Sequence, residues 1–472
     1  MVAKQNQPLL SSKSSTCDAP PQVPGAAFFC GDQLWAPKAM YTVFNMGQSA
    51  LNNFMPVFYD HTAQFSKFEI GVLQTLPSIC SIIAPPLWCA LADRYQNHRL
   101  VHNMSIITGA LLLYTVQFCR DFHITVLLVL VGQFQMAPSG SLLDFAILDM
   151  ISKYGGEYGK QRLFGAVGYG AGAYVTGLVV AAMGVAWAFN LSIFFALLAL
   201  LVLRQIPVMK HGHEDETEAE MVTMEDGSAR TKTLPRRPSF QAGLRHLFHQ
   251  KDVLVLLVVV FLMGLMFGVL SSFLTLNLYN MSDKNAQIIG IAIACETASE
   301  LPAFFFSQKI INKLGTVKVL LISIAGYALR ITYYAFMTNA WSAIPFEFLH
   351  GVTFGLTWAA CTQYVYSSAP RGCEGTVMGV LNAVQNGLGR GAGTLIGGYF
   401  YEHHGARTMW LVADLGVPLS LMGVAAFAYY KSSTQIVEVV LDDEVLETAV
   451  LFSPHNGDPL RLKTPTNTYD EV

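Results

Sequence analysis

Charged residues are scarce in this chain of 472 residues: Asp, Glu, Lys and Arg make up only 13% of it. A soluble globular domain carries about 25% of such residues. Hydrophobic residues make up 53% of the chain, and the mean hydropathy is +0.41. The formal net charge of -3 gives no indication of a nucleic-acid partner. This composition is typical of a chain that lies largely within a lipid bilayer.

Sequence motifs for several kinds of site are also missing. The cysteines are scattered, without a CxxC pair or a Cys/His cluster at zinc spacing, so we expect neither a disulfide framework nor a metal site. No P-loop is present, which argues against an ATP-driven pump, and no nucleophile–base set or cofactor motif indicates an enzyme. The polar N-terminus lacks the apolar core of a cleaved signal peptide, so the first membrane span is expected to direct insertion.

Long apolar runs fill the chain from about Lys38 to Lys431. A bilayer core ~30 Å thick requires about 20 helical residues, and each run reaches that length. We therefore expect transmembrane helices at 37–59, 68–91, 100–119, 122–150, 162–184, 187–206, 252–280, 286–308, 318–338, 341–368, 375–400 and 408–430. The predicted fold class is an all-α membrane protein with twelve transmembrane helices.

One long polar segment, 207–251, divides these runs into two sets of six, 37–206 and 252–430. Its composition cannot bury a core, so we expect a disordered cytosolic linker. Within it, Arg236-Arg237-Pro238-Ser239 is either a kinase site at Ser239 or an ordinary solvated stretch. The polar segments 1–36 and 431–472 are expected to be cytosolic tails.

The distribution of Lys and Arg predicts the orientation of the chain. With the N-terminus inside, the short internal connections carry Arg94, Arg99, Lys153, Lys160, Arg162, Lys309, Lys313, Lys318 and Arg371. The external connections carry fewer: Lys67, Arg120, Lys284 and Arg407. Both termini are therefore expected in the cytosol, and the plasma membrane and an endomembrane fit equally well.

Several motifs resemble those of a known family. Asp93-Arg94, followed by His98 and Arg99, is similar to the cytoplasmic loop signature of the major facilitator superfamily, although its usual Gly is absent. Further motifs resemble the superfamily's associated-domain branch, which is akin to lactose–proton and nucleoside–proton symporters: Gly159 to Gly168, Ser299 to Pro302, Gly326 to Arg330, Glu347 to Gly351 and Gly387 to Gly391. The resemblance covers about Tyr41 to Ala428 without the linker.

This resemblance implies two pseudo-symmetric six-helix bundles, with the substrate bound at the midplane between them. It also implies a gating role for Asp93 and Arg94 at the cytoplasmic side. The alternative for this loop is a connection that merely obeys the charge bias of cytoplasmic loops.

Charges inside the spans mark further candidates, because they are costly in a bilayer unless paired or wetted. Asp144 and Arg162 each lie nine residues from a turn near Lys153, so they reach the same depth on neighbouring helices. The matching positions in the lactose-permease branch hold substrate. A purely structural pair between two helices is the alternative.

Arg330 and His350 each lie ten residues from a turn near Ala340, and Glu347 shares a helix face with His350. Histidine changes its charge near physiological pH, so this set could load and release a proton. The resemblance assigns the residues that match Arg330 and His350 to proton coupling. This chain departs from that pattern: Thr353 stands where the family has its coupling carboxylate, and Glu347 stands where the family has a basic residue. Proton coupling and a structural ion pair both stay open.

Other polar residues are candidates for lining the solute path. Asn386 and Arg390 share a face with Asn382, and Trp358 could stack on a sugar or base ring or simply pack. The first span carries a polar stripe of Tyr41, Asn45, Gln48 and Asn52, which lines the path or bonds between helices. The charge partners of Glu296, Glu300, Arg390 and Asp414 cannot be assigned from the sequence.

These observations predict a secondary active transporter for a small polar organic solute of sugar or nucleoside type, coupled to protons and working without a cofactor. Its expected partners are the lipid bilayer and the solute. The alternatives are an uncoupled facilitator or exchanger, and a transporter-fold receptor or regulatory protein without flux.

Overall fold

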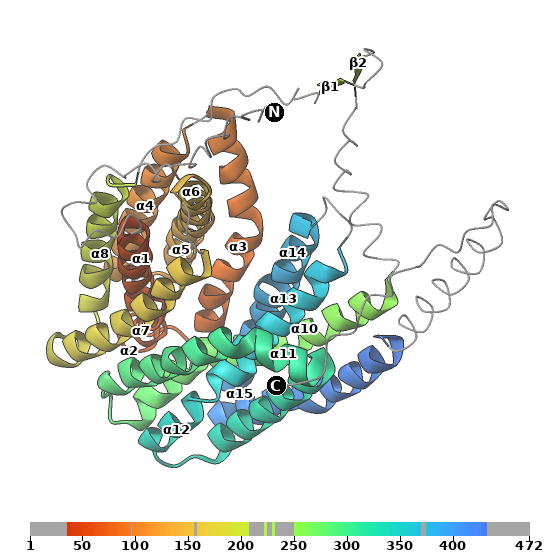
Figure 1. Ribbon diagram of the computed structural model, residues 1–472. Coiled ribbons are helices and arrows are strands. Elements are labelled where there is room, and N and C mark those ends of the chain that lie inside the picture. The colour runs from red at the N-terminus through yellow and green to blue at the C-terminus, as the bar shows by residue number, and fades with distance from the viewer. Residues whose placement is uncertain are drawn as a thin grey trace, which may run out of the picture.

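The computed structural model describes residues 35–95, 97–154, 158–206, 221–223, 229–231, 250–369 and 374–431. These ranges are almost entirely helical (Figure 1). The N-terminal set of helices comprises α1 (Trp35–Asn52), α2 (Met55–His61), α3 (Lys67–Tyr95), α4 (His98–Thr115), α5 (Phe122–Met136), α6 (Pro138–Tyr154), α7 (Tyr158–Met183) and α8 (Trp187–Leu203). The C-terminal set comprises α10 (Lys251–Met281), α11 (Gln287–Phe336), α12 (Ile344–Glu347), α13 (Thr357–Ser367), α14 (Glu374–Asn382), α15 (Arg390–Asp414) and a last helix at 416–431.

Seven helical stretches in the described part are long and apolar enough to cross a bilayer. Two of them, Gln287–Phe336 and Val377–Lys431, are much longer than one crossing requires. Each contains a glycine whose backbone is not helical: Gly315 at φ 77° and ψ 156°, and Gly405 at φ 81° and ψ 171°. Only glycine adopts this conformation readily. Each stretch therefore consists of two helices that meet at a sharp turn.

Two of the expected spans are interrupted next to a proline, and two others, 341–368 and 375–400, contain a π-helical turn. The predicted helix 37–59 is divided into α1 and α2, and Pro56 stands in the first turn of α2. The predicted helix 122–150 is divided into α5 and α6, and α6 begins at Pro138. Proline lacks the amide hydrogen that a continuing helix needs. Apolar run length could not reveal these breaks, although the prolines were visible in the sequence.

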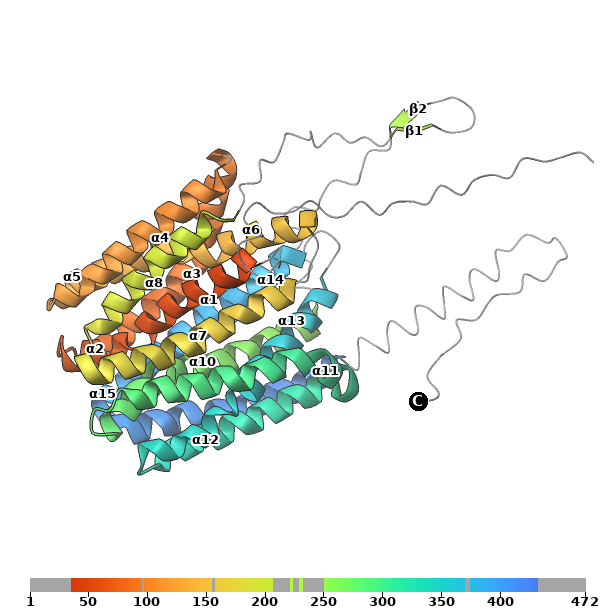
Figure 2. The same ribbon diagram turned by 60° about the vertical axis from the view of Figure 1, so that its left-hand side comes forward.

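The two sets of helices meet along α3 with α15 and along α7 with α11 (Figure 2). At these seams the backbones approach closely. A Cβ placed on Gly71 would lie 3.1 Å from the Cα of Gly398, and one on Gly177 would lie 3.1 Å from the Cα of Gly290. Small residues allow such close helix contacts within membranes.

The expected linker contains one described element. Strands β1 (Met221–Thr223) and β2 (Ala229–Thr231) pair antiparallel, with Met221 opposite Thr231. The β-branched residues of both strands favour this conformation. The described residues are otherwise helical or lie in short connections, and Ser239 lies outside them.

Candidate functional site

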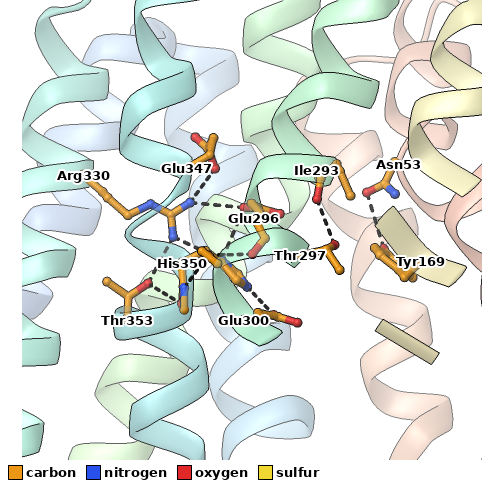
Figure 3. A network of polar contacts seen from close by, with 12 residues as sticks. Asn53, Tyr169, Ile293, Glu296, Thr297, Glu300, Arg330, Glu347, His350 and Thr353 are labelled. Atoms are coloured by element: carbon orange, nitrogen blue, oxygen red, sulfur yellow. Dashed lines mark hydrogen bonds and ion pairs between the residues drawn. The ribbon is translucent and has the colours of Figure 1, made fainter. Parts of the chain in front are cut away.

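A cluster of buried and half-buried ionisable side chains lies within the C-terminal set (Figure 3). Glu296 and Glu300 come from the part of α11 before Gly315, and Arg330 comes from the part after it. Glu347 ends α12, and His350 follows one turn later. The turn at Gly315 folds α11 back on itself, so residues that are 34 positions apart reach the same depth.

Arg330 is the centre of this cluster and is only 1% exposed. Its Nη2 donates to Glu347 Oε2 at 2.7 Å and to Glu296 Oε1 at 3.2 Å. Its Nη1 lies 3.1 Å from Thr353 Oγ1 and 3.2 Å from His350 Nδ1, and its Nε lies 3.3 Å from the Tyr334 hydroxyl. The guanidinium thus uses its whole fork of donors, as a buried arginine must.

His350 connects Arg330 to two carboxyl groups. Its Nε2 lies 2.9 Å from Glu300 Oε1, and its Nδ1 lies 3.3 Å from Glu296 Oε1. Neutral His350 with hydrogen on Nε2 can donate to Glu300 and accept from Arg330 at Nδ1. A proton added at Nδ1 must instead be donated to Glu296. One proton therefore changes which partner faces Nδ1.

The charges of this cluster do not balance without protons. Three carboxylates, from Glu296, Glu300 and Glu347, and one guanidinium, from Arg330, sum to a charge of -2 if His350 is neutral. Glu347 is fully buried, and such an excess of like charge is costly at low dielectric. Tyr334 donates a hydrogen bond to Glu347, which spreads that charge only partly. The arrangement can therefore hold protons at His350 and at a carboxyl group.

A second polar site lies between the two sets of helices. A cavity of about 250 Å³ is lined by Pro77, Ser78, Ser81, Gln133, Ala137, Asn382, Asn386 and Arg390. The first five belong to the N-terminal set and the last three to the C-terminal set. Residues from both sets thus face the same small space, which is where a transported solute would contact both.

Aromatic rings connect the cavity to the ionisable cluster. The Arg390 guanidinium lies 5.5 Å from the centre of the Phe267 ring. Phe267 stacks on Phe354 with centroids 4.9 Å apart, and Phe354 stacks on His350 at 5.4 Å. A change in the position of Arg390 or Phe267 can therefore be transmitted to His350 through direct contacts.

Both sites adjoin π-helical turns. One turn, Gly351–Leu356, directly follows His350, and the other, Ala383–Gly389, carries Asn386 and leads to Arg390. Such turns insert an extra residue into a helix and are frequent at functional sites. They set the rotation of His350 and Arg390 relative to the rest of their helices.

A third group of polar contacts joins the two sets of helices at the end where α2 lies. His61 Nε2 is 2.7 Å from Asn280 Oδ1, and Asn280 Nδ2 donates to Asp60 Oδ2 at 3.3 Å. The backbone amide of Lys67 donates to Glu402 Oε2 at 2.6 Å, while the Lys67 side chain pairs with Asp60. We call these five residues the α2-end clamp.

Comparison with known proteins identifies the family. The sequence profile of the MFS_1 like family matches residues 34–412. The chain belongs to this family of the major facilitator superfamily. It is therefore an integral, multi-pass membrane protein of a transporter family, as the motifs predicted.

Members of this superfamily resemble the chain over most of its length. The maltose permease of Geobacillus stearothermophilus is 26% identical over 399 residues, which cover 80% of this chain and 91% of that protein. The transporter YwbF of Bacillus subtilis is 24% identical over 395 residues, which cover 82% of this chain and 93% of that protein. The crystal structure of nucleoside transporter NupG shares the fold with a TM-score of 0.68 at 16% identity, over 84% of this chain and 98% of that one.

Within this superfamily fold, the expected pair of Asp144 and Arg162 is loose. Arg162 Nη1 lies 3.8 Å from Asp144 Oδ2, and the Arg162 side chain is 64% exposed. Tyr41 of α1 donates a hydrogen bond to Asp144. Tyr41 therefore joins this pair, although the sequence placed it only on the polar stripe.

The rest of the polar stripe on α1 does not act as one surface. Asn45 donates to the backbone carbonyl of Tyr41 at 2.8 Å, Gln48 is half-buried, and Asn52 is exposed. Trp358 is half-buried and packs against the hydrophobic core. Arg94 is exposed near the end of α3, and the side chain of Asp93 lies outside the described residues.

The structure also assigns charge partners that the sequence left open. Glu296 and Glu300 pair with Arg330 and His350, not with Arg390. Asp414 accepts a hydrogen bond from Thr332 at 3.0 Å. Tyr334 was missed, although it lies four residues after Arg330 and so shares its helix face. The α2-end clamp was missed because its residues belong to loops and helix ends far apart in the sequence.

Proposed function

We propose that the protein is a secondary active transporter that moves a small polar organic solute together with protons by alternating access. The proposed architecture has twelve transmembrane spans in two six-helix bundles, 37–206 and 252–430, with both termini in the cytosol. Two features support the count of twelve: the glycine turns divide each long stretch into two helices, and the proline breaks leave α1–α2 and α5–α6 as single spans.

The observation that carries the proposal is the cluster around Arg330. A protein that only scaffolds others has no need for five ionisable groups at membrane depth, because each is costly there unless paired. An excess of two carboxylates over the guanidinium gives the cluster a capacity for protons. Arg330, Glu347 and His350 are proposed to carry proton coupling, together with Glu296 and Glu300.

The cavity at Arg390 is proposed to bind the solute. Asn386 and Arg390 line it from one set of helices and Gln133 from the other. Its volume of about 250 Å³ lies just below the range for ligand pockets, which begins at about 300 Å³, so it suits a small molecule such as a monosaccharide or a nucleoside. Asp144 and Arg162 are a second proposed contact, with Asn45, Gln48, Asn52 and Trp358 as further candidates on the path.

Alternating access requires a seal on one side of the cavity that opens when the other closes. In the proposed topology the α2-end clamp faces the outside, because it includes the connection between the first two spans. We infer that the clamp closes the outer side, and that Asp93 and Arg94 contribute to the seal on the cytosolic side.

The test is transport by purified protein in proteoliposomes that contain a pH-sensitive dye. A panel of sugars, nucleosides and small organic acids is added outside, and internal acidification is recorded. The proposal predicts that at least one solute causes acidification in proportion to its uptake. Solute uptake without acidification would indicate an uncoupled facilitator. Neither uptake nor acidification with folded protein would favour a receptor or regulatory role.

A further inference from the structure

Arg390 is a half-buried cation whose guanidinium has no acidic partner in the part of the chain that the structure describes. It forms no ion pair there, and its buried Nε has no hydrogen-bond partner. The face of the Phe267 ring lies 5.5 Å away, and Tyr169 is another electrostatic neighbour. A cation–π contact of this kind stabilises a cation only modestly, by far less than a charge loses on leaving water.

The carboxyl groups that the sequence offered as partners of Arg390, and that of Glu347, bind other groups. Glu296 and Glu347 bind Arg330, and Glu300 binds His350. Asp414 accepts a hydrogen bond from Thr332. Arg390 therefore differs from Arg330: among the described residues, acids surround the Arg330 guanidinium, whereas the cavity that Arg390 lines has no acid in its lining.

The fold holds Arg390 in this position. A Cβ placed on Gly268 of α10 would lie 2.2 Å from the backbone oxygen of Arg390, so the two helices are in direct backbone contact there. Thr394 also donates to that oxygen at 2.9 Å. The backbone cannot move away without losing this packing, which leaves the side chain at the wall of the cavity.

The other walls of the cavity offer neutral hydrogen-bonding groups. Asn386 and Asn382 are joined by a hydrogen bond of 2.7 Å, and the Gln133 side chain forms none to another described residue. Pro85 lacks the amide that would normally bond to the carbonyl of Ser81, which also lines the cavity. These groups can bind hydroxyl or amide groups but supply no negative charge.

We propose that the solute is a small organic anion whose carboxylate or phosphate binds Arg390, while its polar body contacts Gln133, Asn382 and Asn386. This inference rests on the proposed transport function and names its substrate class. A guanidinium recognises these anions with two parallel hydrogen bonds. The anion supplies the counter-charge that the described residues do not.

An anionic solute also explains how binding is coupled to protons. The cavity and the ionisable cluster are linked by Phe267 and Phe354, so the two sites are neighbours. A negative solute and the unprotonated cluster repel each other, whereas a negative solute and bound protons attract. Each therefore favours the binding of the other by the same factor.

The test compares matched pairs of compounds that differ mainly in charge. Suitable pairs are a hexuronic acid with its hexose, a nucleoside monophosphate with its nucleoside, and a carboxylic acid with its amide. Affinities are measured on purified full-length protein in detergent by calorimetry or ligand-induced thermal stabilisation. We expect the anion of at least one pair to bind at least tenfold more tightly, and Arg390→Gln to remove that preference.

Two further variants separate recognition from folding. Arg390→Lys keeps the charge but loses the two-pronged geometry, so it should bind the anion with intermediate affinity. Arg407→Gln is the control, because Arg407 also lies over a phenyl ring, that of Phe336 at 4.7 Å, but outside the cavity. It should leave the anion preference unchanged. If Arg390→Gln does not fold, the wild-type pairs and Arg390→Lys still decide the question.

Equal affinity for both members of every pair, or no binding by any anion, would overturn the inference. A short-chain anionic phospholipid is included because a lipid headgroup carries the same charge. Its binding in preference to every soluble acid would overturn the assignment to a soluble solute. Proton-coupled uptake of neutral solutes alone would leave the transport function standing and reject the anion. Arg390-dependent anion binding without any flux would support the anion and reject the transport function.

Discussion

Arg330 and Arg390 carry the same side chain in two different environments. Arg330 is surrounded by Glu296, Glu347 and Tyr334, so its charge is compensated within the chain. Arg390 faces a cavity lined by neutral groups. We therefore propose different roles for the two arginines: structure and proton storage for Arg330, and ligand recognition for Arg390.

The burial of Arg330 leads to a prediction about stability. Removing one partner from a buried ionic network costs about 3–5 kcal/mol, whereas an exposed pair contributes about 0–1 kcal/mol. Arg330→Gln should therefore lower the free energy of unfolding by about 3–5 kcal/mol, and Arg162→Gln by about 1 kcal/mol or less. Denaturant-induced unfolding of both variants in one detergent measures the difference. Similar losses for the two variants would show that Arg330 is not the centre of a buried network.

The sequence predicted part of this site from spacing alone. Equal distances from a turn correctly brought Arg330 and His350 together, and helix periodicity added Glu347. It did not link Glu296 and Glu300 to them, because the backward fold of α11 depends on one glycine turn. The distinction between a compensated and an uncompensated arginine depends on which acids lie within about 4 Å, and periodicity contains no such information.

At the scale of helices, turns and breaks determine which side chains meet. Hydrophobic runs predicted nearly every helix, since the bilayer requires long apolar segments. They did not predict the π-helical turns at Gly351–Leu356 and Ala383–Gly389, because these arise from local packing rather than from run length. The breaks at Pro56 and Pro138 arise because proline lacks an amide hydrogen, which the length of an apolar run does not take into account.

Gly315 provides a test at this scale. Its backbone lies in a region that is costly for other residues by about 1–3 kcal/mol, so Gly315→Ala should lower the free energy of unfolding by that amount. Gly379→Ala is the matched control, because Gly379 is exposed within α14 and has open space around it. It should be neutral or stabilising by about 0.4–1 kcal/mol. Equal effects of the two changes, measured by unfolding in detergent, would contradict the assigned turn.

At the scale of the whole molecule, two sets of helices enclose a cavity and are joined by the α2-end clamp. The glycine seams allow the sets to approach, and the clamp adds polar contacts that can break and re-form. A conformation with the clamp closed is one of the two states that alternating access requires. On the proposed mechanism, the hydrogen bonds of the clamp contribute to the relative stability of these states.

Asn280 is the residue through which this balance can be shifted. Asn280→Ala removes its contacts with His61 and Asp60. A net loss of about 1 kcal/mol would change the ratio of the two states about fivefold. Spin labels at Thr62 and Gln287, in a background without accessible cysteines, should report a larger population of long distances. Asn285→Ala, which loses only a contact within its own loop, should not change the distribution. No change in the Asn280 variant would reject the clamp as a gate.

Proton-driven accumulation of solute in proteoliposomes tests the central claim most directly. Glu347→Gln keeps the shape of the buried cluster but removes one carboxyl group, and Asp414→Asn removes a carboxyl group outside the cluster. The account predicts that Glu347→Gln still exchanges solute across the membrane but no longer accumulates it against a gradient when protons flow inward, whereas Asp414→Asn does both. Undiminished proton-driven accumulation in Glu347→Gln would contradict the proposal that this cluster couples protons to transport.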